Sequence, residues 1–211
     1  MDKDNTCKRG GGLVIFCRLL ITAVLVSFMG WCFEKLCRYV AFGSAADRGF
    51  LTLPLCPIYG ISVVAIFFLM GTPSRIGGVL GEKIKITRLW RRVIGDKTWR
   101  QYIFYFIFVA LLSTLAELVT GLCMKPFGVK LWDYSQKPFN FLGIICLEYS
   151  LLWGALITAF MGTLWKPLYG LVKKIPKRES FILAVTLAVA IIADFAVGIV
   201  YLAATGQRFY P

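Results

Sequence analysis

The chain has 211 residues, of which 58% are hydrophobic and 17% are charged. Soluble domains are roughly half apolar and about a quarter charged, so this composition, with its apolar residues in long blocks, predicts an integral membrane protein. The net charge of +13 would indicate nucleic acid as the partner of a soluble protein. In a membrane protein it fits the excess of Lys and Arg in cytoplasmic loops, and we expect no nucleic-acid binding.

The chain contains no histidine, which excludes histidine-based catalysis, histidine metal sites and histidine proton relays. Its seven cysteines form neither a CxxC pair nor a zinc-like spacing, so we expect no metal site and no cofactor. Cys32, Cys37 and Cys56 lie near the predicted outer face, where one disulfide is an alternative to their favoured role as small packing residues.

Five apolar blocks predict about five transmembrane helices in one all-α membrane domain, residues 13–205. A hydrocarbon core about 30 Å thick needs about 20 residues of helix. Four blocks are long enough, and the second is a full span only if residues 50–56 also enter the membrane. The predicted spans are residues 13–33, 57–72, 101–124, 141–165 and 181–204.

The distribution of basic residues predicts the orientation of these spans. With the N-terminal tail 1–12 in the cytoplasm, the inside segments carry 16 Lys and Arg residues and the outside segments carry 7. This bias indicates an N-in, C-out topology, with the tail 206–211 outside. The basic cytoplasmic loop 73–100 has Ile86, Leu89, Trp90, Val93 and Ile94 at helical spacing. We expect an amphipathic helix on anionic lipid at the inner face, and the alternative is docking of a cytoplasmic partner.

Between the first two spans, Pro54 and Pro57 each lack a backbone N–H and each interrupt a helix. The backbone groups that they leave unpaired need partners inside the protein, because lipid supplies none. The functional interpretation of this proline-broken outer segment is the wall of a binding site, as in the broken helices of transporters. The structural interpretation is a tight turn into the second span, and the sequence leaves both open.

Three acidic residues, Glu117, Glu148 and Asp194, fall inside predicted spans. An acid at the centre of a membrane helix costs roughly 2.5–3.5 kcal/mol on insertion scales, and such residues commonly bind ions or substrates. We expect Glu117 to be protonated or paired with Arg48 or Lys130. Glu148 lies on a different helical side from the small residues of its span, which is an unusual place for a carboxyl group.

A polar and aromatic segment separates the third and fourth spans and runs into the fourth without a linker. Its residues Trp132, Asp133, Tyr134, Ser135 and Asn140 are candidates for binding a ligand. The alternative is an interfacial anchor, in which the aromatic rings lie at the membrane surface, Asp133 caps a turn and Asn140 caps the following helix.

A further hypothesis is that the chain contains a parallel internal repeat. Glu34 follows the first span and Cys56-Pro57-Ile58-Tyr59-Gly60 opens the second; Glu117 ends the third, and Cys146-Leu147-Glu148-Tyr149-Ser150 lies near the start of the fourth. The gaps from Glu to Cys are 22 and 29 residues, and the fifth helix is left over.

The motifs GFLTLPLCPIYG, LWDYSQKPFNFLGIICL and SLLWG, with acids at positions 34 and 117, resemble a family of putative ABC-transporter permeases, the CmpB-like, type IV group. The resemblance covers about residues 30–154 and implies a small multi-span protein of the bacterial cell membrane. Because the chain has no P-loop, it implies that ATP hydrolysis comes from a separate ATPase subunit. The family's polar motif positions correspond to Glu34, Pro57, Tyr59, Glu117, Trp132, Asp133, Tyr134, Ser135 and Asn140.

We therefore favour a transport component, a permease-type subunit that binds a small ligand or ion at an outer-facing polar site. Arg48 joins the family motif positions as a ligand-binding candidate, and the intramembrane acids would carry protons or cations. One alternative is a non-catalytic scaffold or sensor. The other is a membrane enzyme that acts on a lipid or envelope precursor, with Glu34, Glu117 and Asp133 as acid–base groups. No catalytic motif supports an enzyme.

Overall fold

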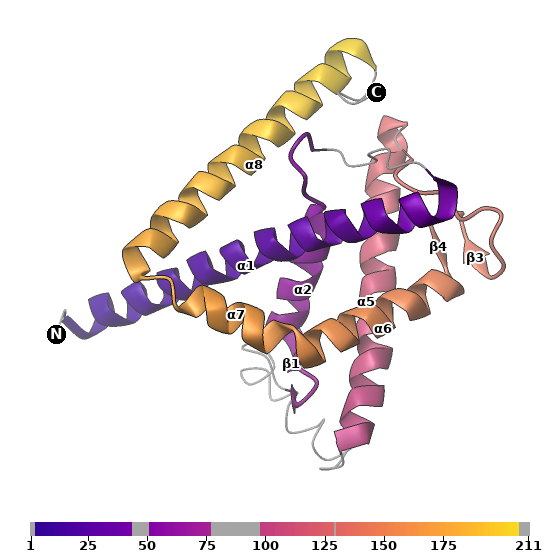
Figure 1. Cartoon of the computed structure of the whole chain (residues 1–211). Coiled ribbons are helices and arrows are strands. Elements are labelled where there is room, and N and C mark those ends of the chain that lie inside the picture. The colour runs from indigo at the N-terminus through magenta and orange to yellow at the C-terminus, as the bar shows by residue number, and fades with distance from the viewer. Residues whose placement is uncertain (1–2, 44–50, 77–97, 129, 207–211) are drawn as a thin grey trace. The chain divides into compact units, whose positions relative to one another are not determined.

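The computed structural model describes residues 3–43, 51–76, 98–128 and 130–206. Within these residues the chain is predominantly helical, which confirms the predicted all-α class (Figure 1). The helices are α1 (Lys3–Phe42), α2 (Pro57–Met70), α5 (Thr98–Met124), the 3₁₀ turn η1 (Lys125–Phe127), α6 (Leu147–Thr163), α7 (Trp165–Lys173) and α8 (Lys177–Thr205). Two short antiparallel hairpins pair β1 (Gly71–Thr72) with β2 (Arg75–Ile76) and β3 (Asn140–Phe141) with β4 (Ile145–Cys146). Arg48, the expected amphipathic helix around residues 86–94 and the tail 207–211 lie outside the described residues.

Three of the described helices are long and apolar enough to cross a membrane: Gly12–Val40, Thr98–Phe127 and Lys177–Thr205. A fourth crossing requires α6 and α7 to act together, although they meet at a 50° bend. Helix α2 has 14 residues, fewer than the roughly 20 that a full crossing needs. Membrane insertion therefore follows from the helices, whereas the count of five spans stays a prediction.

The start of α6 differs most from the expected helix boundaries. A helix was expected from residue 141, but residues 140–146 form the β3–β4 hairpin and α6 begins at Leu147. Phe139, just before β3, has φ 52°, and Leu142 and Gly143 in the hairpin turn have φ 55° and 67°. A helix cannot pass through left-handed backbone. Consequently Glu148 lies in the first turn of α6 and not in the interior of a helix.

The chain forms two compact units, residues 1–64 with 167–211 and residues 65–166, and a single membrane domain stays a prediction. In the first unit, α1 and α8 lie close together where α8 begins and diverge toward its end (Figure 1). Cys17 and Ile21 of α1, Val172 of α7 and Ala184 of α8 form a buried apolar cluster there. The Arg18 guanidinium donates to the carbonyl of Ile175 over 2.9 Å, just beyond the end of α7.

In the second unit, α5 and α6 pack antiparallel. Gly154 of α6 meets Ala110 of α5, and Gly162 meets Tyr102, so the two backbones approach closely along their length. The fully buried Tyr105 hydroxyl donates to the carbonyl of Gly71 over 2.9 Å and fixes α5 to the end of α2. Close packing of small residues is how helices associate in lipid, where the hydrophobic effect contributes little.

Candidate functional site

The first unit holds Glu34 at the junction of α1 and α2. The Tyr59 hydroxyl donates to Glu34 Oε1 over 2.8 Å, and the Cys56 thiol donates to Oε2 over 3.3 Å. Gly30 has no side chain, which lets the Tyr59 ring lie against α1. Pro57 is the first residue of α2, a position where its missing N–H costs no hydrogen bond. Three predicted site residues therefore come together here, and both oxygens of Glu34 receive hydrogen bonds.

The proline-broken segment Leu51–Cys56 is anchored by Asp194 of α8. The Thr52 hydroxyl and the Leu53 N–H both donate to this carboxylate, the latter over 3.0 Å. The Cys56 N–H donates to the carbonyl of Ser27 over 3.1 Å. In Figure 1 this segment rises from α2 toward α8. Asp194 thus supplies hydrogen-bond acceptors to an irregular segment, which gives this acid a structural role.

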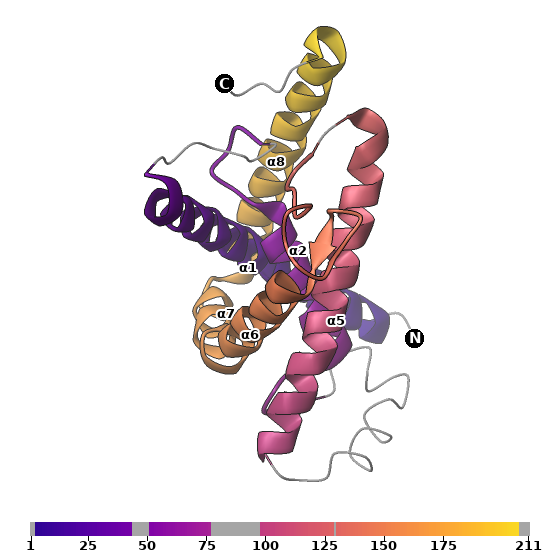
Figure 2. The ribbon, with the colours of Figure 1, turned by 90° about the vertical axis from the view of Figure 1, so that its right-hand side faces the viewer.

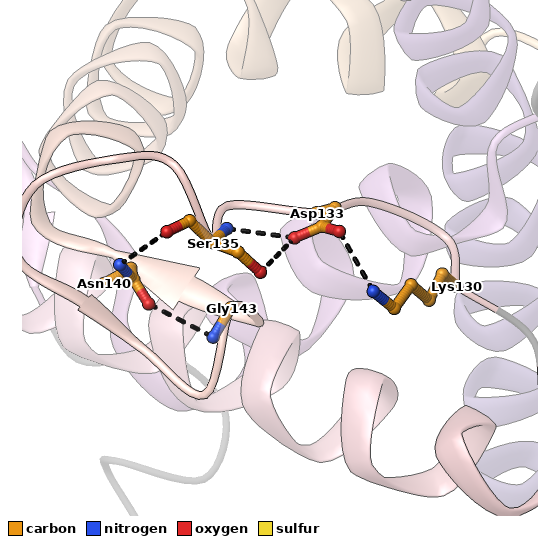
Figure 3. Close-up of polar contacts among 5 residues, drawn as sticks. All are labelled: Lys130, Asp133, Ser135, Asn140 and Gly143. Carbon is orange, nitrogen blue, oxygen red and sulfur yellow. Dashed lines mark hydrogen bonds and ion pairs between the residues drawn. The ribbon is translucent and has the colours of Figure 1, made fainter.

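The loop between η1 and α6 is organised by its own polar side chains (Figure 3). Asp133 accepts hydrogen bonds from the Ser135 N–H over 2.9 Å and from the Ser135 hydroxyl, and forms an ion pair with Lys130 over 3.0 Å. The Asn140 amide donates to the carbonyl of Ser135 over 3.3 Å and accepts from the Gly143 N–H over 3.3 Å. Asp133 caps a turn, as one interpretation expected. Asn140 binds within the loop, and Cys146 is the residue that precedes α6.

The Trp132 side chain closes the same loop. Its indole N–H donates to the carbonyl of Ile144 over 2.6 Å, and the Tyr134 N–H donates to the carbonyl of Gly143 over 2.8 Å. Figure 2 shows the hairpin alongside the C-terminal half of α5, where α6 begins. The side chains of Trp132, Asp133, Ser135 and Asn140 therefore hold the shape of the loop, so four of the five candidate residues in this segment make structural contacts.

These contacts predict a pH dependence of loop stability. The Ser135 hydroxyl and N–H, together with Lys130, hold the pKa of the Asp133 carboxyl well below its usual range. The stabilisation is complete above the ordinary Asp pKa of about 4 and is lost as the pH falls below it. We expect Asp133→Asn to lower the melting temperature at pH 7 and the difference from wild type to narrow by pH 3. A difference that stays constant over this range would contradict the assignment.

The second unit holds Glu117 at the junction of α5, α6 and the loop. Its side chain is 8% exposed, and the Trp153 indole N–H donates to its Oε1 over 3.0 Å. The other oxygen, Oε2, is buried and has no hydrogen-bond partner among the described residues. Burial, followed by the negative charge of Glu117, raises the pKa of Tyr134, which places this hydroxyl close to the acid. The Tyr134 ring stacks on Tyr149 with centroids 4.7 Å apart.

Sequence reasoning assigned no role to two residues of this cluster, Tyr149 and Trp153. They stand four residues apart on α6, and residues at that spacing lie on the same helical face. Trp153 belongs to the SLLWG motif, but nothing in the sequence connects it with an acid 36 residues earlier. A search for aromatic hydrogen-bond donors on the helical face that follows the polar segment would have identified both.

The remaining charged candidates have other partners. Glu148 forms an ion pair with Lys137 over 3.1 Å, with 58% of its side chain exposed. Its position in the first turn of α6 also suits a negative charge near a helix N-terminus. The Lys137 ammonium lies 5.5 Å from the centroid of the Tyr149 ring, and its pKa is raised chiefly by the hydrogen bond to Glu148. Lys130 pairs with Asp133 and not with Glu117.

Where the structure describes side chains, no three His, Cys, Asp or Glu residues lie close enough together to hold a metal ion. A protein-family model described as "Putative ABC-transporter type IV" matches residues 21–199. The matched range includes the second half of α1, all of α2, α5 and α6, the proline-broken segment, the loop and Asp194. No solved structure matches the chain.

Proposed function

The chain belongs to the family described as putative ABC-transporter type IV, and we propose that it is the permease-type subunit of a transporter in the bacterial cell membrane. The long apolar helices support the membrane assignment. The sequence has no P-loop, so a separate ATPase subunit supplies ATP hydrolysis. The bias of basic residues supports a cytoplasmic N-terminus, with the basic loop 73–100 facing anionic lipid and the ATPase.

The observation that carries the binding function is the state of Glu117. A carboxylate buried in a membrane helix is costly, and here only Oε1 has a hydrogen-bond donor within the described part of the chain. A buried acceptor without a donor costs about 1–3 kcal/mol. A small ligand or ion that binds Oε2 would recover this free energy. We therefore assign the ligand site to Glu117, with Trp153 and Tyr134 as its neighbours.

One observation favours a non-catalytic scaffold or sensor as the second candidate function. Most polar side chains of the 130–146 loop are engaged in holding the loop together, as expected of an ordered surface for a partner. A scaffold does not account for the open oxygen of Glu117, which is why we place it second. The enzyme hypothesis needs Asp133 as an acid–base group, but both oxygens of its carboxylate already have partners, Ser135 and Lys130.

The test is ligand-dependent stability in lipid nanodiscs. Wild type and Glu117→Gln are melted with a panel of inorganic cations, small amines, amino acids and sugars at one ionic strength. A ligand present at 100 times its dissociation constant stabilises the folded protein by about 2.7 kcal/mol, which raises the melting temperature by roughly 5–10 °C for a chain of this size. We expect at least one compound to raise the wild-type melting temperature and not that of Glu117→Gln.

The control variant is Glu179→Gln, which replaces an exposed carboxylate in the first turn of α8. It should respond to ligand as wild type does. If every active compound stabilises Glu117→Gln as much as wild type, Glu117 is not the ligand site. Transport then follows in proteoliposomes with the identified compound and the ATPase subunit.

A further inference from the structure

Each unit contains a helix pair in which an acid on the first helix accepts a hydrogen bond from an aromatic residue on the second. In the first unit, Tyr59 donates to Glu34, and the next residue, Gly60, packs on α1. A Cβ on Gly60 would meet Ala23 and Ser27, which precede Glu34 by 11 and 7 residues. The acid, the aromatic donor and the glycine thus stand at fixed spacings along the two helices of the pair.

The second unit repeats these spacings. Trp153 donates to Glu117, and the next residue, Gly154, packs on α5. A Cβ on Gly154 would meet Phe106 and Ala110, which precede Glu117 by the same 11 and 7 residues. Two helix pairs therefore match in the positions of acid, donor and close contact. This match supports the parallel repeat, with Trp153, rather than Tyr149, as the counterpart of Tyr59.

The two copies differ in the cysteine that precedes the second helix. Cys56 stands three residues before the aromatic donor Tyr59, whereas Cys146 stands seven residues before Trp153. Four extra residues are about one helical turn, or roughly 6 Å along the axis. In the first copy the thiol donates to the second oxygen of the acid. In the second copy, no described group donates to Glu117 Oε2.

The chemistry around this open oxygen matches an ammonium group. Glu117 is acidic, its hydrogen-bond donor Trp153 is aromatic, and Trp153 stands one turn along α6 from Tyr149 of the Tyr134–Tyr149 stack. Aromatic rings together with a carboxylate are a recurring environment for ammonium ions. The same stack already contacts one ammonium, that of Lys137, which pairs with Glu148 and lies over the Tyr149 ring. Within the described chain, no Lys or Arg pairs with Glu117.

We propose that Glu117 Oε2 binds a small primary ammonium ion, whose N–H occupies the position that the Cys56 thiol takes in the first copy. This inference rests on the proposed function and names its ligand class. The ammonium group donates to the open oxygen and its charge is balanced by the carboxylate. Glu34 does not bind it, because both oxygens of Glu34 already receive hydrogen bonds.

The test titrates methylammonium chloride against wild type, Glu117→Gln and Glu34→Gln in nanodiscs at constant ionic strength. Sodium chloride and tetramethylammonium chloride are the reference salts. Sodium has neither N–H donors nor affinity for aromatic rings, whereas tetramethylammonium binds aromatic rings but has no N–H donor. We expect methylammonium to raise the melting temperature of wild type and Glu34→Gln by more than either reference salt, with no shift in Glu117→Gln. Glu117→Asp, which keeps the charge and shortens the side chain, serves if Glu117→Gln does not fold, and should weaken binding roughly tenfold.

Two results would overturn the proposal. Equal stabilisation by sodium or tetramethylammonium would show that N–H donation is not recognised. An unchanged methylammonium response in Glu117→Gln, or in a folded Glu117→Asp, would place the ion elsewhere. In either case, a different compound from the wider panel that still depends on Glu117 would leave the proposed function intact. Only the absence of any Glu117-dependent compound would reject both.

Discussion

Replacing Gly60 by valine is expected to destabilise the protein by about 3 kcal/mol, because the position has no room for a side chain. A Cβ at Gly60 would overlap the backbone carbonyl of Ala23 and the hydroxyl of Ser27. A backbone carbonyl cannot turn aside as a flexible side chain can, so α2 must move away from α1. This movement would also withdraw Tyr59 from Glu34. Thermal melting in nanodiscs measures the loss, and Gly60→Ala should give a smaller loss of about 1–3 kcal/mol.

The matched control is Gly170→Ala in α7, where a Cβ would meet nothing within 4 Å. Alanine is a better helix former than glycine by up to about 1 kcal/mol, so this variant should be as stable as wild type or more so. If Gly60→Val and Gly170→Ala melted at the same temperature as wild type, the close approach of α1 and α2 at Gly60 would be wrong.

Replacing Asp194 by alanine should have the second large effect. The carboxylate accepts from the Thr52 hydroxyl and the Leu53 N–H, and both donors lose their acceptor together. Each donor left unsatisfied away from water costs about 1–3 kcal/mol, so for the two donors we expect a loss of roughly 2–6 kcal/mol. This corresponds to a drop in melting temperature of roughly 4–24 °C for a chain of this size. The proline-broken segment should also become sensitive to proteases.

A graded series identifies the bonds. Asp194→Asn keeps one acceptor oxygen and should lose less stability than Asp194→Ala. Thr52→Val removes one of the two hydrogen bonds, so its loss of stability should be no greater than that of Asp194→Asn. Glu179→Gln, an exposed acid on the same helix, should be close to wild type. If Asp194→Ala melts at the same temperature as Glu179→Gln, Asp194 does not anchor the segment and becomes a candidate for ligand binding again.

The helices were predictable from the sequence because hydrophobicity is a local property. The apolar blocks around α1, α5 and α8 are long enough to be recognised without knowledge of their neighbours. The break before α2 was predictable for the same reason, since Pro54 and Pro57 interrupt a helix whatever surrounds them. The family followed from short motifs, which also depend only on neighbouring residues.

The start of α6 was not predictable in this way. Residues 141–147 read FLGIICL, an apolar run that continues into the helix, so composition favours a longer helix. The hairpin forms because the loop supplies specific hydrogen bonds from Trp132 and Asn140, and because the chain adopts positive φ at Phe139 and Leu142. Neither of these two residue types commonly adopts that conformation, and so the sequence carries no signal for it.

The sequence by itself determined that this is an all-α membrane protein of an ABC-transporter family, with acids at costly positions and a parallel repeat as a hypothesis. Only the tertiary structure decided what each acid does. Asp194 anchors a segment that lies about 140 residues earlier, and Glu148 pairs with Lys137 at an exposed position. Among the residues that the structure describes, Glu117 is the one acid of the three with a buried oxygen that receives no hydrogen bond. The physical reason is that the cost of a buried carboxylate depends on partners brought together by folding. Sequence spacing places an acid at a depth in the membrane, but the hydrogen bonds that satisfy it come from distant elements.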